Sequence, residues 1–358
     1  MKHRRGAVVG GLLLSLALVA SACKKEGERK QPEPTPSPQT PTATGGGAGQ
    51  TETPEQAAGP GAITGRKIKI AFSAPSADHG WTGAISVKAK EQAARYDDVE
   101  FSLSQAANAA DQVNQINSII AQKPDVLVVL PHDDTVTPAA LAAMKAGIPV
   151  INVDREFSDP GAQRTVIKGD NYGAGFQAGQ YFARELKCKG NVVEIQGIAG
   201  ISVTTQRTKG FADAIKQCSG GIKVVAQQPA DFAPDKGLAV MRNILQAQQK
   251  IDAVFTHDDD MAQGVVQAIK AANRDKDMWL TGVGGSRAAM DQIKQGGLYR
   301  ATFLYNPTMA ASGVALARLL AKAQGLSDLT EPVIPNLIVM QAQGVFQDNV
   351  DHYVRLAF

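Results

Sequence analysis

The segment "DVLVVLPHDDTVTPAALAAMKAGIPVINVD" (125–154) determines the fold class. It contains two short apolar runs, 125–131 and 148–154, separated by a helix-length stretch from about Val136 to Ala146. Runs that are apolar on both faces are typical of buried parallel strands, and the intervening helix supplies the crossover between them. The segment therefore predicts a β-α-β unit of a doubly wound α/β sheet.

The same alternation extends in both directions from this segment. Before it, strands are predicted at 67–74 and 99–104, followed by helices from about 82 to 95 and 109 to 122. After it, strands and helices alternate through a second series to a long helix at about 308–323. The further strands are expected at 164–169, 191–197, 222–228, 251–257, 278–284 and 300–305. Two successive units predict two α/β lobes, with ligand bound beyond the carboxyl ends of the strands, in the cleft between them.

The N-terminus reads as an export signal. Residues 1–5 are basic, 7–20 are almost wholly apolar, and small residues precede Cys23, so we expect a signal peptide over 1–22. Cys23 stands where a lipoprotein carries its lipid, although Ala20 replaces the leucine usual three places earlier; the alternative is ordinary cleavage with a free thiol at Cys23. Residues 23–66 are rich in Pro, Thr, Gly and charge, which predicts a disordered, lipid-anchored tether.

Charge and cysteine content narrow the class further. The formal net charge of +3 arises largely from the basic signal and tether, so the composition does not indicate a nucleic-acid-binding surface. Cys188 and Cys218 each follow the end of one of two consecutive helices, which often pack side by side. In an oxidising compartment we favour a structural disulfide between them over two separate thiols.

Residues at the predicted strand ends form the candidate site. They include carboxylates, guanidinium groups and aromatic rings, without a nucleophile paired to a base. Carboxylate and guanidinium groups suit hydroxyls that both accept and donate hydrogen bonds, and aromatic rings suit the apolar C–H faces of a sugar. A neutral polyol is the best match, with no cofactor. The proposed ligand-binding residues are Ser73, Asp78, His79, Trp81, Asp154, Arg155, Arg207, Phe232, Asp258 and Tyr305.

Several of these residues also have a simpler structural explanation. Asp154 and Arg155 form a salt bridge at a strand end in that alternative, Arg207 is a solvated helix charge, and the rings of Trp81 and Phe232 belong to the core. Trp279 lies within a strand and is assigned to the core. His132, Asp133 and Asp134 are assigned to a helix start, as are Asp259 and Asp260. A metal site is not expected, because His79 and His257 are single histidines in separate loops.

Five stretches of sequence resemble one family throughout 67–340. The stretches "INVDRE" (151–156), "EIQGIAG" (194–200), "AQQPADF" (226–232), "KGLAVMRNIL" (236–245) and "VFTHDDDMAQG" (254–264) resemble the ribose-binding protein branch of bacterial periplasmic sugar-binding proteins. The resemblance implies two lobes joined by three hinge crossings, near 169–170, 305–306 and 334–335. It implies a first lobe over 67–169 plus 306–334 and a second over 170–305 plus 335–358.

Three positions depart from the family's pattern. Asp258 stands where the ribose binder has an asparagine, Gly284 where it has an aspartate, and Tyr305 where it has a glutamine. Because buried groups without partners disfavour a mismatched ligand, these changes alter which hydroxyls can be paired. The resemblance therefore implies the class of ligand, a pentose, hexose or related polyol, and leaves the individual sugar open.

The sequence as a whole predicts an extracytoplasmic, lipid-anchored receptor without catalytic activity, which delivers a monosaccharide to an ABC permease in the inner membrane. We expect a monomer, with a chemotaxis receptor as a further candidate partner and no nucleic acid. Three alternatives share the fold. A transcription regulator would need an N-terminal helix-turn-helix, an enzyme would need an acid/base pair in the cleft, and a receptor for a nucleoside or furanosyl signal would differ in its ligand.

Overall fold

A computed structural model describes residues 63, 65–77, 80–323 and 334–358 of the chain. The predicted signal peptide, Cys23 and nearly all of the predicted tether lie outside these residues. Among the described residues, no helix is both long enough and apolar enough to cross a membrane.

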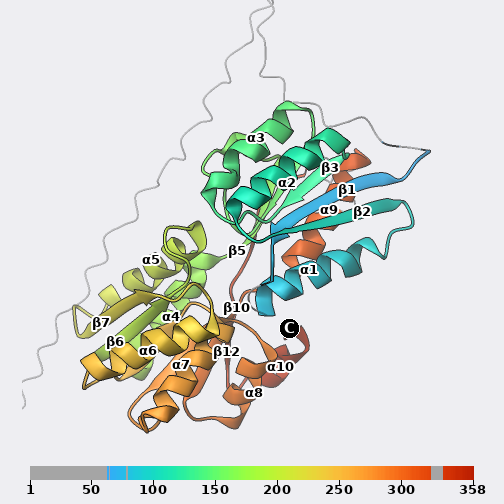
Figure 1. Cartoon of the computed structure of the whole chain (residues 1–358). Helices are drawn as coiled ribbons and strands as arrows, with labels where there is room; N and C mark the ends of the chain where they lie inside the picture. The colour runs from blue at the N-terminus through green and yellow to red at the C-terminus, as the bar shows by residue number, and fades with distance from the viewer. Residues whose placement is uncertain (1–62, 64, 78–79, 324–333) are drawn as a thin grey trace, which may run out of the picture. The chain divides into compact units, whose positions relative to one another are not determined.

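The first sheet has six parallel strands in the order β11-β5-β4-β3-β1-β2. Helices α1 and α9 pack on one face of the sheet and α2 and α3 on the other, as Figure 1 shows. The strands are β1 (Ile68–Pro75), β2 (Val99–Ala106), β3 (Val126–Val129), β4 (Val150–Val153), β5 (Thr165–Gly169) and β11 (Leu337–Met340). The helices are α1 (Gly80–Ala93), α2 (Ala109–Gln122), α3 (Thr137–Lys145) and α9 (Met309–Ala321), with short 3-10 turns η1 (Asp134–Val136) and η2 (Pro160–Ala162).

The second sheet has the order β12-β10-β9-β8-β6-β7, and its edge strand β12 runs antiparallel to β10. Alternate residues of its strands face two separate cores, so Phe255 packs with α4 and α5 while Val254 packs with α6 and α7. The strands are β6 (Gly190–Gln196), β7 (Ile222–Pro229), β8 (Ala253–Thr256), β9 (Trp279–Gly284), β10 (Tyr299–Leu304) and β12 (Gly344–Phe346). The helices are α4 (Asn171–Glu185), α5 (Ser202–Lys216), α6 (Pro234–Ala247), α7 (Asp259–Ala271), α8 (Arg287–Gln295), α10 (Val350–Tyr353) and the 3-10 turn η3 (Val354–Leu356).

The chain passes three times between the two sheets: after β5, after β10 and after β11. The third crossing corrects the prediction from sequence, which placed it near 334–335 and assigned 335–358 to the second lobe. Strand β11 pairs with β5, from Leu337 opposite Val166 to Met340 opposite Gly169, so it belongs to the first sheet. The chain enters the second lobe only between Met340 and Gly344. The antiparallel edge strand β12 was not predicted either.

A disulfide joins Cys188 and Cys218, just beyond the ends of α4 and α5. These two helices pack against each other, with Phe182 of α4 in edge-to-face contact with Phe211 of α5. The bridge therefore links the C-terminal ends of two adjacent helices, and the disulfide predicted from sequence is confirmed.

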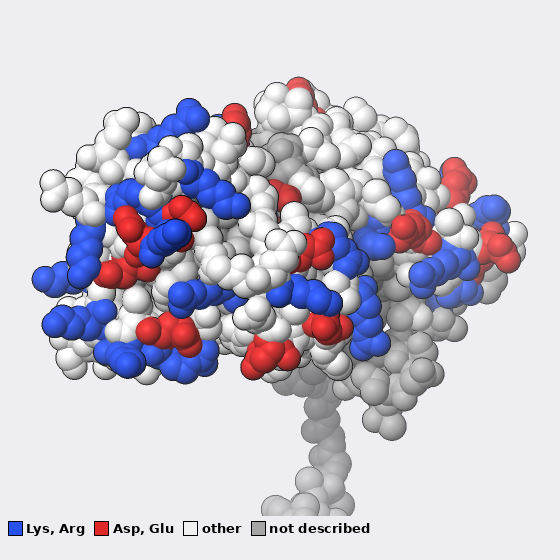
Figure 2. Space-filling model, turned by 90° about the horizontal axis from the view of Figure 1, so that it is seen from below, with Lys and Arg blue, Asp and Glu red and all other residues white. Residues whose placement is uncertain are grey.

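The face of the molecule in Figure 2 carries intermixed basic and acidic side chains.

An ion cluster ties the end of α9 to the start of β2. The guanidinium of Arg318 forms two hydrogen bonds with the Asp98 carboxylate, of 2.7 and 2.8 Å, and Lys322 Nζ lies 2.6 Å from the same carboxylate. The hydrogen bonds from Arg318 and Lys322 hold the pKa of Asp98 well below its ordinary value. A carboxyl whose pKa is lower in the folded state stabilises the fold above its unfolded pKa, and that contribution disappears as pH falls through the folded pKa.

Replacing Asp98 with asparagine should lower stability at pH 7 by at most about 1 kcal/mol, since the cluster is partly exposed to solvent. The difference from the unmodified chain should shrink as pH falls below about 4, where the unfolded carboxyl is protonated. Melting temperatures recorded between pH 7 and pH 2.5 test this, with exposed Asp97→Asn as the control. A difference that stays constant with pH, or one equal to that of the control, would contradict the assignment.

Candidate functional site

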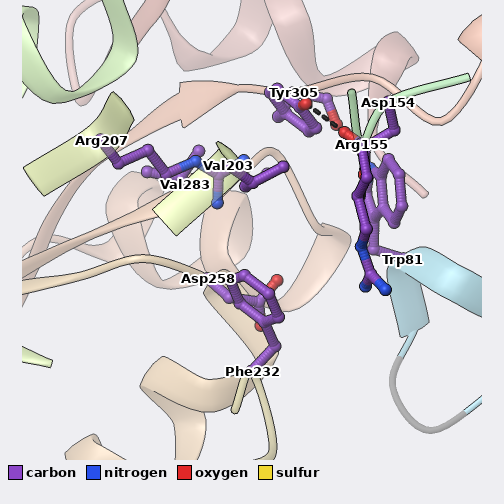
Figure 3. A pocket seen from close by; sticks show the side chains of 10 residues that line it. Trp81, Asp154, Arg155, Val203, Arg207, Phe232, Asp258, Val283 and Tyr305 are labelled. Atoms are coloured by element: carbon purple, nitrogen blue, oxygen red, sulfur yellow. Dashed lines mark hydrogen bonds and ion pairs between the residues drawn. The ribbon is translucent and has the colours of Figure 1, made fainter. Parts of the chain in front are cut away.

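A pocket lies where the carboxyl ends of strands from both sheets meet. Its cavity volume is about 20 Å³, so a sugar-sized ligand would enter only if the walls moved apart. The lining residues are Trp81, Asp154, Arg155, Val203, Arg207, Phe232, Asp258, Val283, Gly284 and Tyr305. Seven of the ten residues predicted from sequence are in this set. Figure 3 shows their side chains arranged around the pocket.

The other three predicted residues are Ser73, Asp78 and His79. Asp78 and His79 lie outside the described residues. Ser73 is fully buried in β1, where its hydroxyl accepts a hydrogen bond of 3.2 Å from Gln112 Nε2. The Gln112 amide also donates to the Leu130 carbonyl and accepts from the His132 amide, so Ser73 supports the loop after β3. Ser73 is thus better described as a supporting residue.

The first-lobe charges follow β4. In the parallel register, Val129 of β3 pairs with Asn152 of β4, which brings Asp154 and Arg155 next to the loop after β3. Arg155 Nη1 donates to the His132 carbonyl at 2.6 Å, and Arg155 Nε lies 3.8 Å from Asp154 Oδ2. The ion-pair explanation and the pocket explanation for these two residues therefore both apply.

Arg207 of α5 contributes the second guanidinium and is almost completely buried. Its Nε donates to Asn171 Oδ1 at 3.0 Å and its Nη1 donates to the His257 carbonyl. The guanidinium carbon lies 4.4 Å from the centre of the Tyr305 ring and 6.0 Å from that of Phe232, within range of cation–π attraction. Arg207 is therefore held by four neighbours and is not the solvated helix charge of the alternative interpretation.

Tyr305 stands at the second crossing and connects groups from both lobes. Its hydroxyl donates to Asp154 Oδ1 and accepts from Asn171 Nδ2 at 3.0 Å, and its carbonyl accepts from Trp81 Nε1 at 2.8 Å. Burial, together with the Asp154 carboxylate, raises the pKa of Tyr305 well above its ordinary value, so the hydroxyl keeps its proton. Asn171, which joins Tyr305 to Arg207, was not identified from sequence, although it begins a helix directly after a strand end.

The three consecutive aspartates after β8 have three different environments. Asp258 caps α7, with Oδ1 accepting from the amides of Asp260 and Met261, and it also lines the pocket. Asp260 Oδ2 accepts from the Gly80 amide of the first lobe at 2.7 Å. The sequence predicted only that Asp260 stands at a helix start. Its hydrogen bond to the other lobe was not predicted.

Asp259 starts α7 as predicted, and its carboxylate is in addition buried and structural. It accepts from the amides of Gly285 and Ser286 at 2.6 and 2.8 Å, from Tyr299 Oη at 2.7 Å and from Thr302 Oγ1 at 2.8 Å. Burial raises the pKa of Asp259 against the effect of these hydrogen bonds. Its role is to hold the turn at Gly285 and Ser286, which directly follows Gly284 of the pocket.

His257 and Glu194 form a buried hydrogen-bonded pair in the second lobe. His257 Nε2 is 2.8 Å from Glu194 Oε1, and Glu194 also accepts from Thr208 and Gln227. Burial lowers the pKa of His257; for Glu194, burial raises the pKa but the hydrogen bonds outweigh it and lower it. A neutral imidazole thus donates to a carboxylate, and this pair fixes the backbone whose carbonyl contacts Arg207.

Two pocket residues have backbone conformations that are uncommon for their types. Asp154 has φ of 74° and Phe232 has φ of 63°, both in the left-handed region. Such conformations are uncommon outside glycine, especially for a bulky side chain, and they gather at functional sites because surrounding structure must hold them.

Within the described residues, no group of three or more metal-ligating side chains is positioned to hold a metal ion. The helix-start role of Asp133 is confirmed, since its carboxylate caps η1 through the Thr135 amide.

Comparisons with known proteins place this geometry among binding proteins. A family model described as a periplasmic binding protein domain matches residues 70–325. The chain is 34% identical to the ribose import binding protein of Bacillus subtilis over 188 residues, 52% of this chain and 60% of that protein. It is 32% identical to the ribose import binding protein of Salmonella typhimurium over 235 residues, 65% of this chain and 78% of that protein.

Solved structures give a similar result over a longer stretch. An ABC transporter solute binding protein from Bacillus halodurans, solved with bound myo-inositol, aligns with a TM-score of 0.74 at 26% identity. The alignment covers 81% of this chain and 98% of that one. The two-lobed fold described above is therefore shared over almost the whole of that structure.

Proposed function

This chain belongs to the family of periplasmic binding protein domains, and we propose on that premise that it captures a monosaccharide in the interlobe pocket and delivers it to an ABC importer. The observation that carries the proposal is the pocket itself. Two carboxylates, two guanidinium groups and three aromatic rings converge there from both lobes and a crossing. The proteins of this family bind solutes, so the proposed role is capture without chemical turnover.

The residue types match the chemistry of a sugar. A sugar hydroxyl both donates and accepts, so a carboxylate such as Asp154 or Asp258 meets its proton and a guanidinium such as Arg155 or Arg207 meets its lone pair. The C–H faces of a sugar ring pack on aromatic rings such as Trp81 and Phe232. The similar proteins are named for ribose or carry a bound cyclic polyol, which supports a ligand of this class.

Ligand binding would close the two lobes over the pocket by shifting an equilibrium between open and closed forms. Groups that already reach across include Asp260, which contacts the Gly80 amide, and Gln206, whose Nε2 donates to Glu156 Oε2 at 2.7 Å. The closed form is then the one that the permease recognises. A chemotaxis receptor is a second partner that would recognise the same form.

Membership of this family places the domain outside the cytoplasm. We further propose that Cys23 carries a lipid and that residues 24–66 tether the domain to a membrane, because small residues precede Cys23 and polar, Pro-rich sequence follows it. The receptor would act as a monomer, since one chain supplies both sides of the pocket.

A thermal-shift screen of the purified protein against pentoses, hexoses, cyclic polyols and nucleosides tests the proposed function. A ligand present at 100 times its Kd stabilises the folded protein by about 2.7 kcal/mol, which raises the melting temperature by several degrees. We expect at least one monosaccharide or polyol to do so, and Asp154→Ala to remove the shift. A shift with nucleosides alone, or with none of these compounds, would contradict the proposal.

A further inference from the structure

The strand ends that surround the pocket differ in what they contribute. The loop after β4 supplies Asp154 and Arg155. The cap of α7 supplies Asp258, and the crossing after β10 supplies Tyr305. The end of β9 supplies Val283 and Gly284 instead. This part of the lining therefore has no polar side chain.

The absence of a side chain at Gly284 is a consequence of the local backbone. Gly284 has φ of 146°, a value that L residues rarely adopt, and a Cβ at this position would lie 3.2 Å from Asp259 Oδ2. The Gly284 carbonyl already accepts from the Tyr305 amide at 2.9 Å. The backbone at the end of β9 thus favours glycine, and the nearby Asp259 carboxylate already accepts from Gly285, Ser286, Tyr299 and Thr302, so β9 offers a sugar hydroxyl no polar side chain of its own.

Apolar side chains complete the same region. Val203 and Val283 are 3% and 1% exposed, and Val203 packs in one cluster with Ile201 and Phe232. In Figure 3, Val203 and Val283 are seen on the Arg207 side of the view, while Asp154, Arg155 and Trp81 are seen on the other side. The aromatic rings already offer surface to the C–H faces of a sugar ring. An additional aliphatic wall suits an edge of the ligand that lacks a hydroxyl.

We propose that the ligand is a deoxy sugar, whose methyl or methylene group faces Val203, Val283 and Gly284 while its remaining hydroxyls meet the charged residues. This inference rests on the proposed function and narrows its substrate class. A parent sugar with a hydroxyl at that position would have to bury it without a hydrogen-bond partner, and sites discriminate strongly against such a loss.

Matched pairs of sugars that differ by one hydroxyl test the inference. Suitable pairs are D-fucose with D-galactose, 6-deoxy-D-glucose with D-glucose, L-rhamnose with L-mannose, and 2-deoxy-D-ribose with D-ribose. Isothermal titration of the purified full-length mature protein gives Kd for each. We expect the tightest ligand to be a deoxy sugar that binds at least about tenfold more tightly than its parent, equal to about 1.4 kcal/mol.

Val203→Thr provides the second test, since threonine has nearly the shape of valine and adds one hydroxyl to the wall. It should reduce the preference for the deoxy member of the best pair by about tenfold. Val266→Thr is the matched control, because Val266 is a buried valine of α7 that does not line the pocket, and it should leave the preference unchanged. Val283→Thr replaces Val203→Thr if that variant fails to fold.

The outcomes separate this inference from the proposed function. If parent sugars bind as tightly as their deoxy counterparts in every pair, or if the threonine variants leave the preference unchanged, the inference is wrong and the proposed function stands. If no sugar or polyol binds, the proposed function fails and the inference fails with it.

Discussion

Replacing Arg207 with alanine is expected to weaken sugar binding at least about 100-fold, equal to about 2.7 kcal/mol. The side chain is almost fully buried in the pocket, where it contacts Asn171, the His257 carbonyl and the Tyr305 ring. Hydrogen bonds to a charged group contribute about 1.5–3 kcal/mol each, and alanine removes both the group offered to the ligand and the support for Asn171. Titration calorimetry with the best ligand of the screen measures the change.

Arg242→Ala is the matched control for this experiment. Arg242 lies on the exposed side of α6 in the same lobe, and its removal should leave Kd unchanged. Melting temperatures without ligand show whether Arg207→Ala remains folded. A folded Arg207→Ala protein that binds within tenfold of the original Kd would contradict the role assigned to this residue.

Removing the disulfide is expected to have the largest effect on stability. Cys188 and Cys218 are separated by 30 residues, and closing a loop of that length stabilises the fold by about 3–4 kcal/mol in the chain-entropy model. Cys188→Ser with Cys218→Ser should therefore lower the melting temperature by roughly 10 °C. The bridge follows the C-terminal end of α5, whereas Val203 and Arg207 lie near its start, so Kd should change little.

Each single serine variant provides an internal control, because either one alone prevents the bridge from forming. The two single variants and the double variant should have similar melting temperatures, and dithiothreitol should lower that of the unmodified chain alone. Equal melting temperatures with and without the bridge would show that it does not stabilise the second lobe.

The fold was predictable because its signals are local. Parallel strands buried on both faces, such as 126–129 and 150–153, are apolar except at Asn152, and the helix between them has the length of a crossover. Strands β11 and β12 were missed because they are short edge strands that follow the last long helix. Their pairing with β5 and β10 depends on contacts far along the chain, and β11 is only partly buried.

Site residues that directly follow a strand end could be predicted from the sequence. Site residues whose position depends on how the elements pack together could not. Asp154, Arg155 and Tyr305 follow strands directly, so their place was clear from the strand assignment. Ser73 belongs to the body of β1, where alternation turns its side chain toward α2 and Gln112. Asn171 requires knowledge of how α4 packs on α5.

The aspartates after β8 show the same limit at the scale of single residues. Charge at a helix start explains a capping residue such as Asp258. It does not reveal that Asp259 turns inward to hold Gly285 and Ser286, nor that Asp260 reaches the Gly80 amide of the other lobe. Those contacts arise from the turn after β9 and from the meeting of the lobes.

A crystal structure of the protein with the best ligand of the screen tests the central claim most directly. We predict density for one sugar in the interlobe pocket, with its hydroxyls within hydrogen-bonding distance of Asp154, Arg155 or Arg207 and a C–H face against Trp81 or Phe232. A sugar bound outside this pocket, with none of these residues in contact, would contradict the account.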